Sequence, residues 1–592
     1  MLPRRPLFVT ILLVCSGTTG SLSAQVLDLS GGWRFHPGDD PRWAQPNYDD
    51  AQWPVLQSGE TWEAQGYPNL DGFAWYRKQI SIPKTMSEQT RYRLSGALWL
   101  SLDRIDDVHE TWINGQRVGG RGTFPPQYVS AQKSRQAYAV PGRLLRWGQT
   151  NLIAVRVYDG QGDGGLIGNR PRLRVATAKE VFALNWDLRG SNGLFDAAGP
   201  IIFRMRLHNG TPHTWDGRLH WTVEDDEGTA MDSTEQPYTL PVGEVMSAEH
   251  TFQPPAPGFY RVTCEFRSLD EKLKTKLSRI VGYQPQEIVA PLTRATDFAA
   301  FWKQTREALD RVPPAYAIQR RAELDTTHHE VYEVSMHSLD NVRVGGWYQK
   351  PKSSGPVPAL IRVPGYGQKM QPLRKQSGQL AGMAILSFNV RGHGNSQQDV
   401  PGQPADFWIR GLDDKQQYYY RGAYMDCLRA VDFLTTRSEI DPTRIAIAGG
   451  SQGGGLSLAT AALDSRISLC AADIPFLCDW VKYFKASHWP EMDKWIAAKP
   501  ERSWKSTLRT LSYFDTLNLV DRIRCPVLIS LGVQDGVCPA STVFSVYNRL
   551  QHRKQFRAYP ETGHQVPAAH HMLRTRWIAR EFSRIGPPPT NR

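Results

Sequence analysis

The stretch from Arg444 to Leu456, RIAIAGGSQGGGL, limits the possible folds more than any other part of the chain. Ile445 and Ile447 give the apolar run of a buried strand, and the small residues and leucines from Gly453 onward are typical of a helix packed closely on a sheet. Ser451 therefore lies at a strand-to-helix turn, in a GxSxG pattern whose glycines allow the strained backbone that exposes a serine hydroxyl. We expect a nucleophile at Ser451, with a plain glycine-rich junction as the alternative.

Residues 291–587 alternate between apolar strands and amphipathic helices. Strands rich in valine, isoleucine and leucine that are separated by helices indicate a mostly parallel sheet covered on both faces. Together with the turn at Ser451, this order predicts an α/β-hydrolase catalytic domain over 291–587. The clearest expected strands lie within residues 358–367, 382–396, 467–476, 525–536 and 555–564, and the clearest helices within 296–312 and 421–437.

The two preceding segments, residues 26–177 and 178–286, contain short alternating strands and turn residues. Asn114-Gly115 is a strong signal for a hairpin turn. We expect a β sandwich over 26–177 and an immunoglobulin-like β sandwich over 178–286, which holds no catalytic constellation and whose default role is that of a spacer or packing domain. The expected strands lie within residues 75–82, 91–102, 109–118 and 150–158 of the first segment and 200–209, 217–228, 247–255 and 258–268 of the second.

Residues 1–24 have the pattern of a signal peptide, with Arg4 and Arg5 followed by an apolar run and small residues up to Ala24. We therefore expect export to the periplasm or the extracellular space. The apolar run is too short for a stable membrane span, and no later stretch approaches the required length. The 7 cysteines show no CxxC motif and no regular spacing, which excludes a zinc ribbon or a disulfide scaffold and favours buried free thiols.

The net charge of +12 does not indicate a nucleic-acid partner. Lysine and arginine are scattered through all segments and interleaved with acidic residues, so the sequence has no basic arm. We expect solvated basic faces, and neither a metal nor a cofactor is required by the chemistry considered below.

A serine nucleophile needs a histidine base that is oriented by a carboxylate, and in this fold the chain order is Ser, Asp or Glu, His. Asp535 follows the apolar strand PVLISLG, and His564 follows QFRAYPETG, so both lie where strands end at the carboxyl edge of the sheet. We expect a triad of Ser451, Asp535 and His564. Other acidic residues and histidines after the serine stand in less favourable contexts: Asp479, Asp515, Asp521, His552, His570 and His571.

The oxyanion that forms during attack on an ester needs preorganised N–H donors. One donor in such hydrolases is the residue after the nucleophile, here Gln452. The second comes from a loop after an earlier strand, and the glycines of VPGYGQ allow a close approach to the carbonyl oxygen. We expect the N–H of Tyr366 to fill this role, with a simple strand-ending turn as the alternative.

Six motifs of the C-terminal segment go beyond the general hydrolase pattern: PLTRATDFAAFW, GGSQGGGL, RGHGNS, YYYRGAYMDCLRAVDFL, ADIPFLCD and QDGVCPAST. With them the segment resembles the acetyl xylan esterase and cephalosporin C deacetylase family, carbohydrate esterase family 7. The resemblance implies removal of acetyl groups from acetylated sugars, with Ser451, Asp535 and His564 in the triad and Tyr366 and Gln452 lining the oxyanion hole.

Two positions depart from that family, which usually has RGQ and HE. This chain has His393 in place of the glutamine and Gln565 in place of the glutamate. Loss of the carboxylate at position 565 removes a possible ion-pair partner of His564 but no member of the triad. For His393 we favour a structural hydrogen-bonding role over that of an extra base. The added β domains put the ring-like oligomer of the family in doubt, and a homo-oligomer stays open.

The first segment resembles the galactose-binding-like jelly-roll domain of β-galactosidase and β-glucuronidase type glycoside hydrolases, on GGWRF, WEAQGY, DGFAWYRK and IDDVHETWINGQRVG. Such modules bind sugars through aromatic rings and a few polar groups, although the domain is often only a scaffold. Most of its tryptophans are expected to be core residues: Trp33, Trp43, Trp53, Trp62, Trp75 and Trp112.

These observations predict an exported serine esterase that deacetylates carbohydrates, most directly acetylated xylan or xylo-oligosaccharides, with a small acyl pocket walled by Pro475–Trp480. One alternative is a serine peptidase of the prolyl oligopeptidase type, which usually carries a propeller of repeated blades, and the sequence shows no such repeat. The other is a carbohydrate-binding protein with an inactive hydrolase domain. The partner in the favoured interpretation is an acetylated oligosaccharide or polysaccharide.

Overall fold

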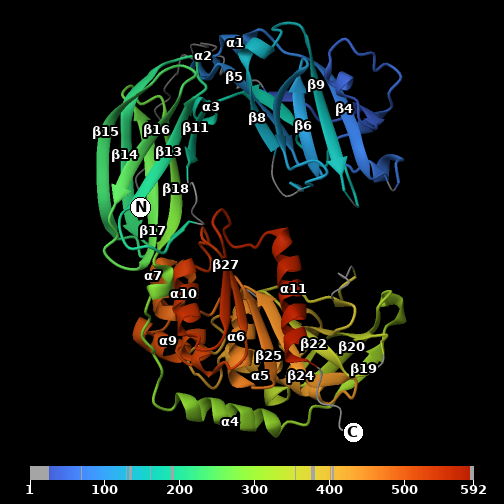
Figure 1. Cartoon of the computed structure of the whole chain (residues 1–592), viewed down its shortest axis with the longest axis vertical. Helices are drawn as coiled ribbons and strands as arrows, with labels where there is room; N and C mark the ends of the chain where they lie inside the picture. The colour runs from blue at the N-terminus through green and yellow to red at the C-terminus, as the bar shows by residue number, and fades with distance from the viewer. Residues whose placement is uncertain are drawn as a thin grey trace, which may run out of the picture.

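The computed structural model describes residues 26–586, except 69, 129, 132–135, 161, 188–192, 354, 375–379, 401, 403–405 and 488. The expected signal peptide therefore lies outside the described residues. Two β-sheet parts are followed by one part of mixed helices and strands (Figure 1), and each part has its own hydrophobic core. None of the helices in the described ranges is long and apolar enough to span a membrane.

The first part consists of two antiparallel sheets, in the strand orders β1-β10-β5-β8 and β3-β2-β4-β9-β6-β7. The hairpin predicted at Asn114-Gly115 is confirmed, because it joins β6 to β7. The elements are β1 (Val26–Asp28), β2 (Gly32–Pro37), β3 (Val55–Gln57), β4 (Gly72–Ser81), α1 (Thr85–Glu88), α2 (Thr90–Ser95), β5 (Ala97–Asp103), β6 (Val108–Ile113), β7 (Gln116–Arg121), β8 (Gln136–Pro141), β9 (Thr150–Asp159) and β10 (Arg172–Val175).

The tryptophans of this part are mainly core residues, as predicted. Trp112 is half-buried and stacks on the buried Trp75. A buried indole offers no face to a ligand, so the tryptophan content by itself does not indicate a sugar site. The buried tryptophans are Trp33, Trp43, Trp53, Trp62 and Trp75.

The structure corrects one predicted strand. Residues 91–95, expected to begin a strand, lie in the helix α2, and the strand β5 starts only at Ala97. Gly96 ends the helix with φ 65°, the left-handed conformation that glycine adopts without a steric penalty. The segment is too short for its apolar pattern to distinguish a helix from a strand.

The middle part is also built from two sheets, β11-β13-β16 and β12-β18-β17-β14-β15. The residues of β14 alternate between buried and partly or fully exposed positions, as expected of a strand with one face on a core. The elements are α3 (Ala178–Val181), β11 (Phe182–Trp186), β12 (Leu194–Phe195), β13 (Ile201–Asn209), β14 (Trp215–Asp225), β15 (Ala230–Leu240), β16 (Val245–Phe252), β17 (Gly258–Ser268) and β18 (Lys274–Tyr283).

The third part contains a sheet in the order β19-β20-β21-β23-β22-β24-β25-β26-β27. The strands from β23 to β27 in this order are parallel, whereas β19, β20 and β21 pair antiparallel at one edge, so the predicted mostly parallel sheet is confirmed. The strands are β19 (Ala317–Arg320), β20 (His329–His337), β21 (Arg343–Pro351), β22 (Val357–Val363), β23 (Ala384–Asn389), β24 (Ile440–Gly450), β25 (Ile467–Asp473), β26 (Val527–Gly532) and β27 (Lys554–Tyr559).

Helices cover both faces of this sheet. α11 buries Trp577 and Phe582 against one face, and α4, α5, α6 and α10 contribute to the core on the other. The adjacent residues Leu360 and Ile361 of β22 lie in these two different cores, which explains the continuous apolar runs of the strands. The helices are α4 (Phe298–Asp310), α5 (Tyr419–Thr435), α6 (Gln452–Leu463), α7 (Trp480–Ala486), α8 (Pro490–Ala497), α9 (Trp504–Leu511), α10 (Ala540–Arg549) and α11 (Ala568–Ile585).

The first turn of α6 lies directly against the loop that follows β22. A Cβ atom on Gly453 would lie 2.6 Å from the carbonyl oxygen of Val363 and 3.0 Å from that of Pro364. Such distances to backbone atoms leave no room for a side chain. The missing side chain at Gly453 therefore brings the strand-to-helix turn of Ser451 next to the loop that carries Tyr366.

We predict that Gly453→Ala destabilises the fold, whereas Gly450→Ala leaves its stability close to that of the wild type. Gly453→Ala should sharply lower the yield of folded protein and its thermal unfolding temperature. The new side chain would push the first turn of α6 and the loop after β22 apart. In Gly450→Ala the nearest atom would lie 3.8 Å from the new Cβ, an ordinary contact. Thermal unfolding followed by circular dichroism tests this, and equal destabilisation by both changes would contradict the packing argument.

Candidate active site

Ser451 has the backbone conformation of a strained turn. Its φ of 57° and ψ of −120° are rare for a residue with a side chain. The turn is held by hydrogen bonds, since the Ser451 N–H donates to the carbonyl of Asp473 and its carbonyl accepts from the Phe476 N–H, both at 2.9 Å. The strain is thus fixed by the neighbouring strand β25 and the segment that follows it.

The structure brings the three predicted triad residues together. His564 Nε2 lies 2.9 Å from Ser451 Oγ, and His564 Nδ1 lies 2.9 Å from Asp535 Oδ2. With its proton on Nδ1, the imidazole donates to Asp535 and accepts from the Ser451 hydroxyl. The residues come from the end of β24 and from the loops after β26 and β27. This arrangement can take a proton from a serine and return it to a leaving group.

The carboxylate of Asp535 is buried and fully engaged. Its other oxygen, Oδ1, accepts hydrogen bonds from the backbone N–H groups of Val537 at 2.8 Å and Cys538 at 2.9 Å. These donors fix the orientation of the carboxylate towards His564. Cys538 was not identified from the sequence as a residue that supports the triad, although it lies in the QDGVCPAST motif.

The other acidic residues considered from the sequence have structural contacts. Asp479 caps α7 by accepting from the Lys482 N–H, and Asp521 pairs with Arg294. Asp515 accepts from the N–H groups of Asp479 and Trp480, and its burial raises its pKa to about 7.

The other histidines considered from the sequence are either exposed or part of a different buried hydrogen-bond network. His570 is buried and bonds the side chains of Asp473 and Tyr559. His552 and His571 are exposed. Gln565, the departure next to His564, is exposed as well.

Gln452 and Tyr366, the predicted oxyanion donors, lie on α6 and on the loop that packs against its first turn. Gln452 is the first residue of α6, so its N–H has no acceptor within the helix. Tyr366 lies in the loop that packs on the same helical turn at Gly453, and its hydroxyl accepts a hydrogen bond from the Trp408 N–H at 3.1 Å. The two residues thus belong to the two elements that meet at Gly453, and their role as oxyanion donors stays a prediction.

His393 connects these two flanking elements. Its Nε2 accepts a hydrogen bond from the Gly367 N–H at 3.2 Å and lies 3.4 Å from the side-chain nitrogen of Gln452. Its Nδ1 lies 3.2 Å from the carbonyl of Arg391, which requires a proton on Nδ1. Burial lowers the pKa of His393, which favours this neutral form. The contacts agree with the structural hydrogen-bonding role favoured from the sequence.

Arg391, of the same RGH motif, is held by a buried ion pair. Its guanidinium and its N–H donate to both carboxylate oxygens of Asp426 on α5. The Asp426 carboxylate helps to raise the pKa of Arg391 although burial acts in the opposite direction. The pair fixes the loop that carries His393 on helix α5.

Two groups of side chains in the described residues have ligand atoms within 4.8 Å of one another: Asp535, Cys538 and His564, and Asp106, Asp107 and Asp159. In the first group Asp535 and His564 already hydrogen-bond each other. Burial raises the pKa of the Cys538 thiol well above its usual value, which disfavours the thiolate that a metal would need. We assign no metal to either group.

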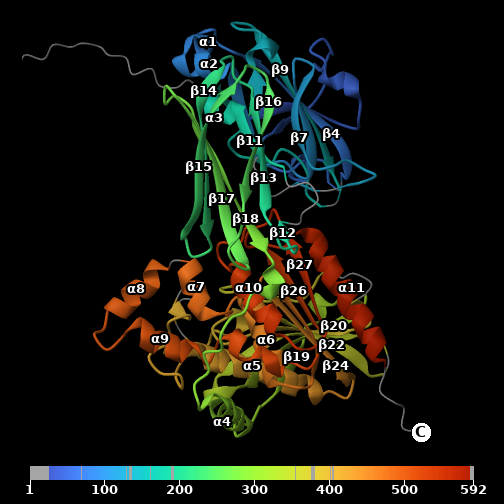
Figure 2. The ribbon, with the colours of Figure 1, turned by 60° about the vertical axis from the view of Figure 1, so that its left-hand side comes forward.

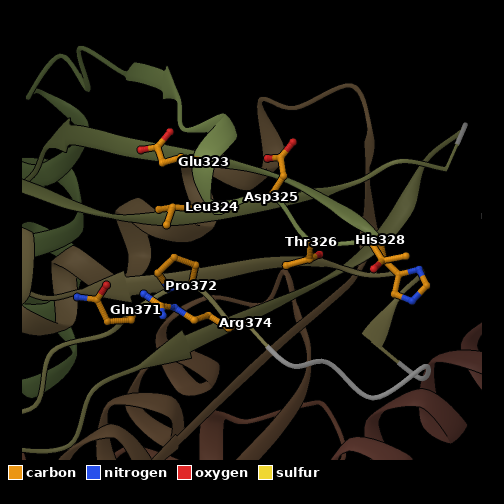
Figure 3. Close-up of a pocket in the computed structure, with 9 residues that line it drawn as sticks. Glu323, Leu324, Asp325, Thr326, His328, Gln371, Pro372 and Arg374 are labelled. Carbon is orange, nitrogen blue, oxygen red and sulfur yellow. The ribbon is translucent and has the colours of Figure 1, made fainter. Parts of the chain in front are cut away.

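Figure 3 shows a pocket between the start of β20 and the loop after β22. Glu323 and Asp325 lie on one side of it, and Gln371, Pro372 and Arg374 on the other. None of the triad residues lines this pocket, so we do not place the substrate there.

The family model for acetyl xylan esterase (AXE1) matches residues 273–580, and the chain belongs to this family. It is therefore a carboxylic ester hydrolase of the acetyl xylan esterase type.

Relatives match different shares of the chain. The acetyl esterase Axe7A of Xylanibacter ruminicola is 29% identical over 51% of this chain and 70% of that protein. The β-galactosidase BoGH2A of Bacteroides ovatus is 29% identical over 24% of this chain and 16% of that protein. A solved acetyl xylan esterase from Paenibacillus sp. R4 is 34% identical and covers 50% of this chain and 98% of that one, with a TM-score of 0.46.

We predict that His393 makes the enzyme sensitive to mild acid. The pKa of His393 is lower in the folded state than its unfolded value of about 6.5. Its contribution to the free energy of unfolding is therefore complete above pH 6.5 and falls as the pH drops towards the folded pKa. His393→Gln keeps an acceptor for the Gly367 N–H without a titrating group. The thermal unfolding temperature, measured from pH 8 to pH 5, should therefore fall less steeply in the variant than in the wild type.

The exposed His552→Gln is the matched control, and its unfolding temperatures should follow those of the wild type. Identical pH dependence of the wild type and His393→Gln would contradict this role of His393.

Proposed function

We propose that the protein is an exported serine acetylesterase that removes acetyl groups from acetylated carbohydrates, with acetylated xylan or xylo-oligosaccharides as the first candidates. The observation that carries this proposal is the continuous contact from Ser451 through His564 to Asp535 at 2.9 Å per step. Membership of the acetyl xylan esterase family supports the choice of the acetyl ester.

The proposed reaction follows from these contacts. Ser451 Oγ attacks the acetyl carbonyl while His564 takes the hydroxyl proton, and Asp535 stabilises the imidazolium that forms. The N–H groups of Gln452 and Tyr366 stabilise the negative oxygen of the tetrahedral intermediate. His564 then protonates the departing sugar oxygen. Water, activated by the same histidine, releases acetate and restores Ser451.

We place the acetyl methyl group against the segment from Pro475 to Trp480. Phe476 is buried, and its N–H bonds the Ser451 carbonyl, so the segment lies beside the nucleophile. The Phe476 ring packs edge-on against those of Trp480 and Tyr483, with centroids 5.2 and 5.4 Å away. Such dense aromatic packing supports a preference for a short acyl group.

The two alternative functions receive less support. A peptidase of the prolyl oligopeptidase type usually carries a propeller, whereas the described residues before 291 form sheets of three to six strands in two separate cores. An inactive hydrolase would not need a strained Ser451 that is hydrogen-bonded to His564, which is in turn hydrogen-bonded to Asp535.

We further propose that the first part is a galactose-binding-like jelly roll and the middle part an immunoglobulin-like sandwich. The two sheets in each part, antiparallel except for the parallel pair of β12 and β18, and the resemblance of the chain to a β-galactosidase support this assignment. A sugar-hydrolase module next to an acetylesterase supports a glycan as the substrate.

Ser451→Ala should reduce acetate release from acetylated xylo-oligosaccharides by a factor on the order of 10⁴ to 10⁶, because the nucleophile is lost while the fold is kept. The same variant should no longer react with a fluorophosphonate probe. Ser583→Ala, an exposed serine on α11, is the control and should match the wild type. A folded Ser451→Ala with normal acetate release would rule out the proposed mechanism.

A further inference from the structure

The middle β part touches the two loops that carry the catalytic acid and base. Its strands β17 and β18 reach the hydrolase beside β27 (Figure 2). Gly193, just before β12, packs on the Asp535 and His564 loops, because a Cβ at this position would lie 3.4 Å from Pro560 and 3.8 Å from Val533. Ile280 of β18 packs against the hydrolase core. The contact between the middle part and the hydrolase therefore involves the loops that carry Asp535 and His564.

Gln534, the residue before Asp535, is hydrogen-bonded to the middle part like a residue of an adjacent strand. Its Oε1 accepts from the Ile280 N–H and its Nε2 donates to the Ile280 carbonyl, both at 2.9 Å. The neighbouring strand β12 pairs with β18 only at Gly282 and Tyr283, so the carboxamide of Gln534 continues this edge. The position of the Asp535 loop is thereby tied to β18.

Arg279, also on β18, holds the other loop. Its guanidinium donates to both carboxylate oxygens of Glu561, one of them at 2.7 Å, and to the carbonyl of Pro560 at 3.1 Å. The Arg279 side chain is 8% exposed and that of Glu561 72%, so a buried cation depends on this loop for its partner. Glu561 stands three residues before His564.

The two contacts converge on one atom. The carbonyl oxygen of Pro560 accepts from Gln534 Nε2 at 2.9 Å and from Arg279 Nη2 at 3.1 Å. The backbone N–H of Gln534 also donates to the carbonyl of Thr562 at 3.0 Å. The acid loop, the histidine loop and β18 are therefore joined within a few residues of the Asp535–His564 hydrogen bond.

We propose that Arg279 and Gln534 are positioning residues that set the distance between Asp535 and His564, so that the middle β part is a working component of the catalytic apparatus. This inference rests on the proposed function. Misplacement of a catalytic group by about 1 Å can cost about 100-fold in rate, so small shifts of these loops matter. The sequence suggested only a spacer or packing role for this segment.

A different contact between the same two parts provides the control. Lys482 on α7 pairs with Asp226 at 2.7 Å and Glu227 at 3.1 Å, on the loop after β14. These two ion pairs join the middle part to the hydrolase, and none of their three residues lies in the loop of Asp535 or that of His564. Glu227→Gln therefore weakens the junction without acting on the triad.

The test compares Arg279→Ala and Gln534→Glu with Glu227→Gln in the full-length protein. We expect both loop variants to lower kcat for acetate release by about 10- to 100-fold with KM within about twofold of wild type. The acid limb of the kcat/KM profile should move to lower pH, because a displaced Asp535 stabilises the protonated imidazole less. Arg279→Lys should recover part of the loss, and Glu227→Gln should behave as wild type.

Circular dichroism and thermal unfolding check that each variant is folded, and if Arg279→Ala fails to fold, Gln534→Glu decides. An unchanged kcat and pH profile in the folded loop variants overturns the proposal, as does an equal loss in Glu227→Gln. The outcomes are separable from the proposed function: activity in Ser451→Ala refutes the mechanism, whereas an inactive Ser451→Ala with unaffected loop variants refutes only the positioning role.

Discussion

The backbone contact between the first turn of α6 and the loop after β22 is the constraint on which the rest of the site depends. Because Gly453 has no side chain, the helix approaches the carbonyls of Val363 and Pro364 closely. That approach places the start of α6 beside the Tyr366 loop, while backbone hydrogen bonds to Asp473 and Phe476 hold Ser451 in its strained turn. His393 joins the same two elements, since it accepts a hydrogen bond from the Gly367 N–H and contacts the side chain of Gln452. Ser451 and its neighbours are thus held in place by contacts within the protein itself.

Much of this site could be predicted from the sequence because its signals are local. A strand, a glycine turn and a small-residue helix identify Ser451. Asp535 and His564 follow because parallel strands end at the same edge of a sheet, which brings together loops that are distant in the chain. Local patterns fail where they are short, as at residues 91–95, whose pattern fits a strand or a helix and which form part of α2.

The remaining residues could not be found in this way, because their partners are far away in the sequence and in another part of the fold. Arg279 and Glu561 are 282 positions apart, and Gln534 and Ile280 are 254 apart. Nothing in the residues around Arg279 distinguishes it from the other arginines on the exposed strands of a sandwich. Its burial is created by the docking of two parts, and burial turns an ordinary surface charge into one that needs a specific partner.

The strand β18 belongs both to a sheet of the middle part and to the segment matched by the esterase family model. It pairs with β17 along most of its length inside the middle sheet, yet the family match begins at residue 273 and includes it. After β18 the chain continues along the hydrolase, where Asn548 donates to the carbonyls of Pro285 and Ile288 before the helix α4 begins. A cut before this strand leaves the sandwich without its interior strand, and a cut after it removes Arg279 from the esterase. The middle part and the esterase are therefore joined by a strand that contributes to both, and not by a linker alone.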